Sequence, residues 1–206
     1  MLYTASTDGN FANAEILDSF GVPGLDPTGG DDCACNFQDG SGVRKADAPK
    51  APDAVWDKSH WDVTNDFSSG PYFGVKNMAD MTPRQWDGAV IDPTLFMTEI
   101  ADPNDVWSGR FVEIYSPDGA GQVIGQKNGL DLYLALTSNT NTAYNSQVKL
   151  TGETIGNDGF LIVCNNQDTF ASYGGATCDV VSGGTVNSNG DDAYTVSCAA
   201  TYRFFE

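Results

Sequence analysis

The chain has 206 residues, of which 40% are hydrophobic, so it is long enough and apolar enough to bury a core. Its formal net charge is −18, with −9 in residues 1–94 and −9 in residues 95–206. This acidic surface disfavours a nucleic-acid partner, and no apolar run approaches the roughly 18 residues of a membrane-spanning helix, so we expect no membrane insertion. The single histidine, His60, argues against a His-rich metal centre and is expected to be exposed.

The composition favours an exported protein. Glycine is frequent (23 residues), lysine and arginine are few (10 together), and the five cysteines suit disulfides with one left over. Residues 1–10 show neither the charged nor the apolar region of a signal peptide. We therefore expect a mature form with an added Met1, located outside the cell or on the cell surface.

Short runs with β-type patterns, bounded by turn residues, predict strands along most of the chain. In the first third they are Glu15–Phe20 and Gly42–Lys45, and residues 66–95 resemble a linker. A short helix is predicted within Asn166–Tyr173. The clearest strands follow the linker: Phe96–Ala101, Gly109–Ser116, Leu130–Leu136, Ser146–Gly152, Gly159–Cys164 and Asp192–Cys198.

This number and spacing of short strands predict an all-β sandwich. Alternation is clearest in LDLYLAL, where every second residue from Leu130 to Leu136 is leucine. Because successive side chains of a strand point to opposite faces, these four leucines share one face. That face is expected to lie in the core.

Four motifs of the second half occur in a set order. They are Glu99–Ile100, FVEIY at Phe111–Tyr115, TI-x-x-x-GFLIV at Thr154–Val163 and NGDDA at Asn189–Ala193. Together they cover about 100 residues and resemble the lamin-tail domain, which occurs in nuclear lamins and in secreted and cell-surface proteins. The resemblance implies an immunoglobulin-like β-sandwich.

The segments that close a lamin-tail domain occur here before the segments that open it. ILDSFG at Ile16–Gly21, FQDGSGVRK at Phe37–Lys45 and SHWDV at Ser59–Val63 resemble the back of the family pattern. The resemblance thus divides the chain into a back portion (1–65), a linker (66–95) and a front portion (96–206).

Three arrangements fit this inverted order. The chain is a permuted domain that closes on itself, one period of a tandem array, or a subunit whose back portion completes its neighbour by strand exchange. In the first and third, the family order implies that the first predicted strand pairs antiparallel with Asp192–Cys198. The pairing residues would be Ile16, Leu17, Asp18, Ser19 and Phe20. Exchange that does not close would build a filament, so self-association is expected.

The cysteines suggest two disulfides. Cys164 and Cys178 flank one short excursion, and we expect them to be bridged. Cys198 ends the last predicted strand, and a bridge from it to Cys33 or Cys35 would staple the two portions together. Buried thiols are the alternative.

Two acidic groups invite a chemical interpretation. The turn NSNGDD places oxygen-bearing side chains at alternate positions, as calcium loops do, although a tight hairpin turn is the favoured interpretation. Its calcium candidates are Asn187, Asn189, Asp191 and Asp192. Glu99 and Glu113 are the obvious carboxylate pair, but we expect a structural role for them, capping backbone or meeting Arg110 or Arg44. No catalytic residue and no cofactor other than calcium is expected.

Scattered tryptophans offer one further candidate site. Trp56, Trp61, Trp86 and Trp107 could form a carbohydrate platform, but pinning loops to the core is favoured. The leading hypothesis is a non-enzymatic, secreted structural protein that builds an extracellular or surface assembly. The alternatives are a monomeric adhesion or ligand-binding module, calcium-dependent and carbohydrate-directed, and an accessory domain of a secreted nuclease or hydrolase.

Overall fold

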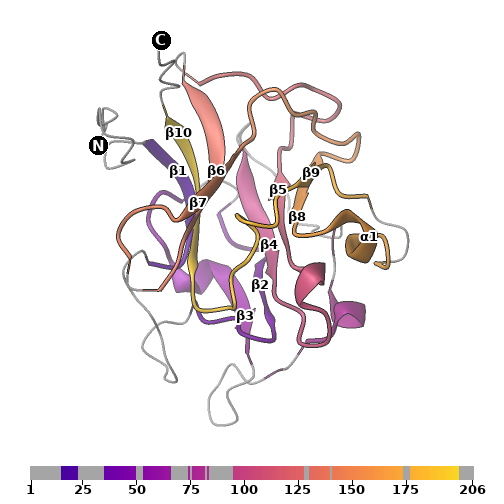
Figure 1. Cartoon of the computed structure of the whole chain (residues 1–206). Coiled ribbons are helices and arrows are strands. Elements are labelled where there is room, and N and C mark those ends of the chain that lie inside the picture. The colour runs from indigo at the N-terminus through magenta and orange to yellow at the C-terminus, as the bar shows by residue number, and fades with distance from the viewer. Residues whose placement is uncertain are drawn as a thin grey trace, which may run out of the picture.

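The computed structural model describes residues 15–22, 35–49, 53–65, 74, 76–81, 83, 95–127, 130–139, 141–173 and 177–199. These residues form two β-sheets with short helices and long connections around them (Figure 1). Among them, no helix has the length and apolar character needed to cross a membrane. The predicted all-β sandwich is confirmed at this level.

The first sheet has four strands in the order β1-β10-β6-β7, and all of them run antiparallel to their neighbours. Its edges are therefore β1 and β7. The strands are β1 (Glu15–Phe20), β10 (Ala193–Ala199), β6 (Asp131–Thr137) and β7 (Ser146–Lys149).

The second sheet has six strands in the order β3-β2-β4-β5-β8-β9. Only the β8–β9 pair is parallel. The strands are β2 (Ser41–Arg44), β3 (Trp61–Thr64), β4 (Phe96–Ala101), β5 (Phe111–Tyr115), β8 (Phe160–Cys164) and β9 (Val180–Val181).

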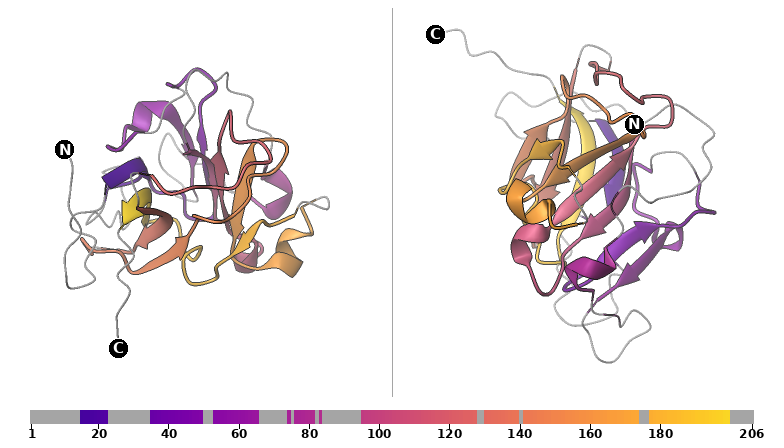
Figure 2. Two further views of the ribbon diagram at one scale, coloured as in Figure 1. Left: turned by 90° about the horizontal axis from the view of Figure 1, so that it is seen from above. Right: turned by 90° about the vertical axis from the view of Figure 1, so that its right-hand side faces the viewer.

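The helical elements are short and lie outside the sheets (Figures 1 and 2). The predicted helix is present as α1, shorter than the segment 166–173 that contains it, and the Asn166 side chain accepts a hydrogen bond from the Thr169 N–H at its start. Their bounds are η1 (Lys58–His60), η2 (Met78–Asp80), η3 (Trp107–Gly109) and α1 (Gln167–Phe170).

The core lies between the two sheets and takes side chains from both portions of the chain. Leu132, Leu134 and Leu136 are buried in it, and Leu130 packs against it, as the alternating pattern predicts. Leu17 and Phe20 of β1 belong to the same cluster as Ile100 and Val112 of the second sheet. The back portion therefore contributes side chains to a core that it shares with the front portion.

A second apolar cluster joins α1 to the second sheet. Phe170 of α1 packs against Phe111, with ring centroids 5.4 Å apart, and Met81 from the predicted linker lies in the same cluster. The Asn104 N–H donates to the Lys76 carbonyl, and the Met78 N–H donates to the Asp105 carboxylate. The described part of the predicted linker is thus hydrogen-bonded to the front portion and packs against it.

The predicted disulfide between Cys164 and Cys178 is confirmed. Its Cα atoms are 5.9 Å apart, and the bridge closes the excursion that holds α1. Replacing both cysteines with alanine is expected to lower the free energy of unfolding by about 3 kcal/mol, because the unfolded chain then gains the entropy of an open loop. Thermal unfolding of the double variant, compared with that of Cys198→Ala, checks this. Equal loss in both variants would contradict it.

Candidate functional site

The contact between the two portions of the chain is the most elaborate feature of the molecule. In the first sheet, β1 pairs antiparallel with β10, with Glu15 opposite Cys198, Ser19 opposite Thr195 and Phe20 opposite Tyr194. Figure 2 shows these strands, indigo and yellow, side by side. The structure therefore contains the strand pair expected from the family order, and it forms within one chain.

A second ladder joins the portions in the other sheet. There β2 lies between β3, which also belongs to the back portion, and β4 of the front portion. Gly42 is opposite both Val63 and Ile100. The back portion thus supplies an edge strand to one sheet and two neighbouring strands to the other. It has no separate core among the described residues.

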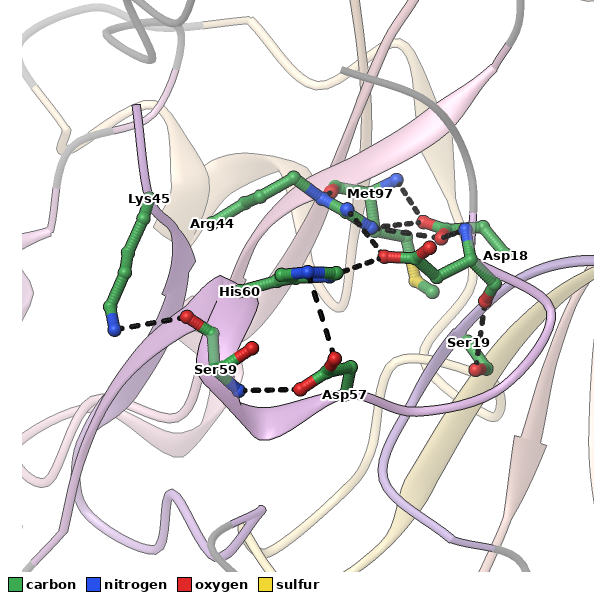
Figure 3. A network of polar contacts seen from close by, with 9 residues as sticks. Asp18, Ser19, Arg44, Lys45, Asp57, Ser59, His60 and Met97 are labelled. Atoms are coloured by element: carbon green, nitrogen blue, oxygen red, sulfur yellow. Dashed lines mark hydrogen bonds and ion pairs between the residues drawn. The ribbon is translucent and has the colours of Figure 1, made fainter. Parts of the chain in front are cut away.

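A buried ion pair lies where β1 meets the second sheet (Figure 3). The Arg44 guanidinium and the Asp18 carboxylate are both fully buried, and Arg44 Nη2 donates to Asp18 Oδ1 at 2.8 Å and to Oδ2 at 3.1 Å. Two backbone N–H groups, of Asp53 and Met97, donate to the same carboxylate at 2.7 Å each. Arg44 Nε donates to the Met97 carbonyl at 2.9 Å.

This polar network extends through Asp53 to His60. Asp53 Oδ2 accepts from Arg44 Nη1 at 3.3 Å and lies 2.7 Å from His60 Nδ1. The histidine side chain is only 19% exposed, so the prediction that His60 is exposed is wrong. His60 ends η1 and its ring contacts Asp53, which explains why it is less exposed than expected.

Aromatic side chains surround the same contact. Phe20 lies at the centre, with its ring centroid 5.3 Å from Phe37, 4.6 Å from Trp56 and 4.9 Å from Trp61. Arg44 Cζ lies 4.9 Å from the centroid of the Trp61 ring, within cation–π range. All five residues belong to the back portion.

Burial has a clear effect on the carboxyl groups of this region. Desolvation raises the pKa of Asp18 to about 6, against the lowering effects of Arg44 and of the Asp53 and Met97 N–H groups. Burial likewise raises the pKa of Asp102 and of Asp192. All three carboxyl groups therefore bind protons more readily in the folded chain than in the unfolded one.

Stability is accordingly expected to increase as the pH falls from about 7 to about 4. Between the folded pKa of about 6 and the usual value of 3.8, the folded state binds the Asp18 proton and the unfolded state does not, a gain on the order of 3 kcal/mol. Urea unfolding from pH 8 to pH 4 measures the trend. In Asp18→Asn the trend should be shallower, and a wild-type stability that falls steadily below pH 7 would contradict the prediction.

The expected bridge from Cys198 to Cys33 or Cys35 does not form. Cys198 is a fully buried thiol in the core, opposite Glu15 and Leu132 in its two ladders, whereas Cys35 is disulfide-bonded. Cys33 lies outside the described residues. The β1–β10–β6 ladder accounts for the burial of Cys198.

Two of the calcium candidates have hydrogen-bond partners outside their own turn. Arg110 Nη1 donates to Asn187 at its Oδ1, whereas Asp192 Oδ1 accepts from the Asn139 N–H, and Asn189 is exposed. Asp191 is half-buried. Within the described part of the chain, no group of three or more His, Cys, Asp or Glu side chains is placed to hold a metal ion.

The turn that contains these candidates is not a tight hairpin. It connects β9 of the second sheet with β10 of the first, and the Gly190 carbonyl accepts from the Phe37 N–H at 2.6 Å. Gly190 has a φ of +95°, and a Cβ there would lie 2.0 Å from Gln38 N. At Gly190 the backbone of the front portion therefore lies very close to the backbone of the back portion at Phe37 and Gln38.

The predicted carboxylate pair is brought together on the outer face of the second sheet. Glu99 of β4 stands opposite Glu113 of β5, and both are buried. Thr98 Oγ1 donates to Glu113 Oε1 at 2.5 Å. Arg44 and Arg110, the cations suggested for these glutamates, bond Asp18 and Asp102.

The three tryptophans that the structure describes differ in their exposure. Trp61 is buried in the core and Trp56 packs against it, 5.9 Å away between ring centroids, whereas Trp107 is 65% exposed in η3. Trp86 lies outside the described residues. The pinning role fits Trp56 and Trp61, and these positions give no support to a carbohydrate platform.

Sequence reasoning identified β1 but not the network that holds it. Two residues give a sequence signal for the network. Asp18 is an acid inside an otherwise strand-like run, and Arg44 is a cation in a short strand. Neither pattern shows that the two side chains meet across sheets. Asp53 and His60 gave no signal of their own.

Comparison with protein-family models, with curated proteins and with solved structures found no match to this chain. The lamin-tail type therefore remains a prediction from the motifs, beside the two-sheet architecture that the structure contains.

Proposed function

We propose that this chain is a non-enzymatic structural protein of lamin-tail-like, immunoglobulin-like type, which acts outside the cell or on the cell surface as a subunit of an assembly. In the assembled form, the back portion of one subunit completes the sandwich of the next by strand exchange. The same ladders that close the single chain would then join neighbours.

The organisation of the back portion supports exchange most directly. The ion pair of Asp18 with Arg44, its extension to Asp53 and His60, and the aromatic cluster around Phe20 all lie within residues 15–65. These contacts would persist when the back portion leaves its own chain and joins a neighbouring subunit. Exchange would replace the β1–β10 and β2–β4 ladders, and the Met97 contacts, by the same contacts to a neighbour.

The position of β1 supports the same proposal. An edge strand has one ladder, so β1 leaves its sheet by breaking its pairing with β10 alone. Because the exchanged and closed forms bury similar surfaces, protein concentration shifts the balance, and the high effective concentration within one chain favours closure in dilute solution.

Glu15→Cys provides a direct test of exchange. Position 15 stands opposite the native thiol of Cys198, and paired residues of antiparallel strands lie within disulfide range. Oxidation of concentrated protein is expected to give a ladder of covalent multimers on non-reducing gels. Oxidation of dilute protein should give a cross-linked monomer, and Glu15→Cys/Cys198→Ser should give neither product.

The contrary result is equally clear. If concentrated protein yields only the intrachain bond, and light scattering finds only monomers, the back portion closes on its own chain and the exchange proposal is wrong.

A further inference from the structure

A cavity, the linker cavity, lies where the described part of the predicted linker meets the front portion. Its volume is about 400 Å³, within the range of sites that bind small ligands. Met78 and Met81 line it from the linker, and Asp105 and Tyr173 line it from the front portion. These residues take no part in the β1–β10 and β2–β4 ladders, so the cavity is separate from the contacts that strand exchange would replace.

One wall of the linker cavity is apolar and fixed in place. The Tyr173 hydroxyl donates to the Gly109 carbonyl at 2.6 Å, and the ring centroid lies 5.6 Å from that of Phe111 and 5.0 Å from that of Phe170. Met78 Sδ lies beside this hydroxyl, because a Cβ on Gly109 would be 3.2 Å from the sulfur and 3.0 Å from the hydroxyl oxygen. Methionine thioethers are polarisable and adapt to the shape that they contact. This wall therefore suits an alkyl or aryl group.

The charge in the lining is negative. Asp105 is the only charged residue among the described residues that line the linker cavity. It is exposed, its Oδ1 accepts from the Met78 N–H at 2.8 Å, and its Oδ2 has no hydrogen-bond partner in the described part of the chain. A carboxylate that is oriented by a backbone N–H and keeps one oxygen for a ligand favours a cation that can donate a hydrogen bond.

The surroundings of Tyr173 have the same sign of charge. Burial raises the pKa of the Tyr173 hydroxyl, and three nearby carboxyl groups raise it further. They belong to Glu99, Asp105 and Asp102. Asp102 is paired with Arg110, and Asp105 alone of the three lines the cavity. The field that disfavours a negative charge on Tyr173 favours a positive charge beside it.

We propose that the linker cavity binds a small organic cation that has an alkyl or aryl body and a primary ammonium group. The ammonium group donates to the Asp105 carboxylate, and the body packs against Met78, Met81 and Tyr173. Because the ligand contacts both the linker and the front portion, it holds the described part of the linker against the front portion. Its binding requires neither strand exchange nor an assembly, so either proposal can fail alone.

The full chain carries its own reporters for this site. It has four methionines, of which Met78 and Met81 line the linker cavity and Met97 is fully buried in the main core. In protein with isotope-labelled methionine methyl groups, hexylammonium at physiological ionic strength should shift the nuclear magnetic resonance signals of Met78 and Met81 and leave that of Met97 unchanged. Equal shifts in all three signals, or no shift at Met78 and Met81, would overturn the proposal.

A series of ligands separates the role of the charge from that of the apolar body. Hexylammonium should bind about tenfold more tightly than hexan-1-ol, which lacks the charge, and than methylammonium, which lacks the body. Hexanoate should leave both signals unchanged. Equal binding of methylammonium would mean an adventitious counter-ion only, and equal binding of hexan-1-ol would mean an apolar contact only. Tighter binding of Nα-acetyl-lysine methylamide than of hexylammonium would assign the cavity to a protein partner. Each of these three results would overturn the proposal.

Asp105→Asn tests the carboxylate. The amide oxygen can still accept from the Met78 N–H, but the charge is gone, so the affinity for hexylammonium should fall about tenfold. Asp118→Asn is the matched control, because it removes the same charge from an exposed position outside the linker cavity. Equal losses in the two variants would show a general attraction to the acidic surface and contradict a specific site.

A cavity-filling substitution localises the ligand. Ala79 is exposed and lines the linker cavity, so Ala79→Trp should abolish the binding of hexylammonium. Ala171→Trp is its control, since Ala171 is also exposed but does not line the cavity. Cooperative thermal unfolding verifies that each variant folds. Binding that survives Ala79→Trp, or that is lost in both variants, would overturn the assignment to this cavity.

Discussion

Arg44→Met is expected to lower the free energy of unfolding by about 3–5 kcal/mol at pH 8. Arg44 is the cation that faces Asp18, whose carboxyl group is fully buried, and it also bonds the partly buried Asp53. Removing the guanidinium leaves a buried carboxylate without its counter-ion and the Met97 carbonyl without the Nε donor. Urea unfolding at constant pH measures the loss.

The pH dependence separates this explanation from a simple packing defect. Because the pKa of Asp18 is already about 6 with Arg44 present, its carboxyl group should take up a proton at still higher pH in Arg44→Met. The loss should therefore shrink between pH 8 and pH 5. A loss that is the same at both pH values would contradict the electrostatic account.

Two further variants test whether the loss in Arg44→Met comes from the uncompensated charge of Asp18. Asp18→Asn should cost much less at pH 8, because Arg44 keeps Asp53 as its acid and the neutral side chain resembles protonated Asp18. Arg44→Met/Asp18→Leu should recover part of the stability lost in Arg44→Met, since an apolar pair needs no compensating charge. Failure of the double variant to recover any stability would contradict this assignment.

The strands could be predicted from the sequence because their signals are local. Glu15–Phe20 and Phe96–Ala101 are present with the predicted bounds, and the leucines of β6 face the core as their alternation requires. The bounds of β3 could not be set from the sequence, which indicates only an extended surface segment around Trp61, because Trp61–Thr64 is short and follows a proline-rich stretch. The two-residue β9 carries too few positions to show any alternation.

Contacts between distant segments were harder to predict, because no local pattern encodes them. The β1–β10 pair was predicted only from the order of family-like motifs. The Asp18–Arg44 pair depends on a register shift between Ile16 and Asp18, which no hydrophobic pattern reveals. Cys198 was assigned to a disulfide from its position in the sequence, whereas its ladder with Leu132 buries it as a thiol.

Phe20→Ala is expected to cost about 3–5 kcal/mol, a loss comparable with that of Arg44→Met. The ring is fully buried and contacts Phe37, Trp56 and Trp61 edge-on, so its removal leaves a cavity at the meeting of β1 with β2 and β3. Denaturant unfolding measures the cost, and hydrogen exchange should show β1 opening more readily than β8. Equal opening of both strands would argue that Phe20 does not hold β1 in particular.

Gly42→Ala tests the same packing from the opposite strand. A Cβ at position 42 would lie 2.5 Å from Phe20 Cε2, so the single substitution should destabilise the fold by roughly 1–3 kcal/mol through overpacking. In the Phe20→Ala background the ring is gone, and the same substitution should cost little or partly fill the cavity. Gly125→Ala, whose Cβ meets nothing within 4 Å, is the control for the glycine change itself. Additive losses in the Phe20→Ala/Gly42→Ala variant would mean that the ring and the glycine do not constrain each other. Strong coupling would instead identify Gly42 as the residue that lets β1 approach the second sheet closely enough for Asp18 to reach Arg44.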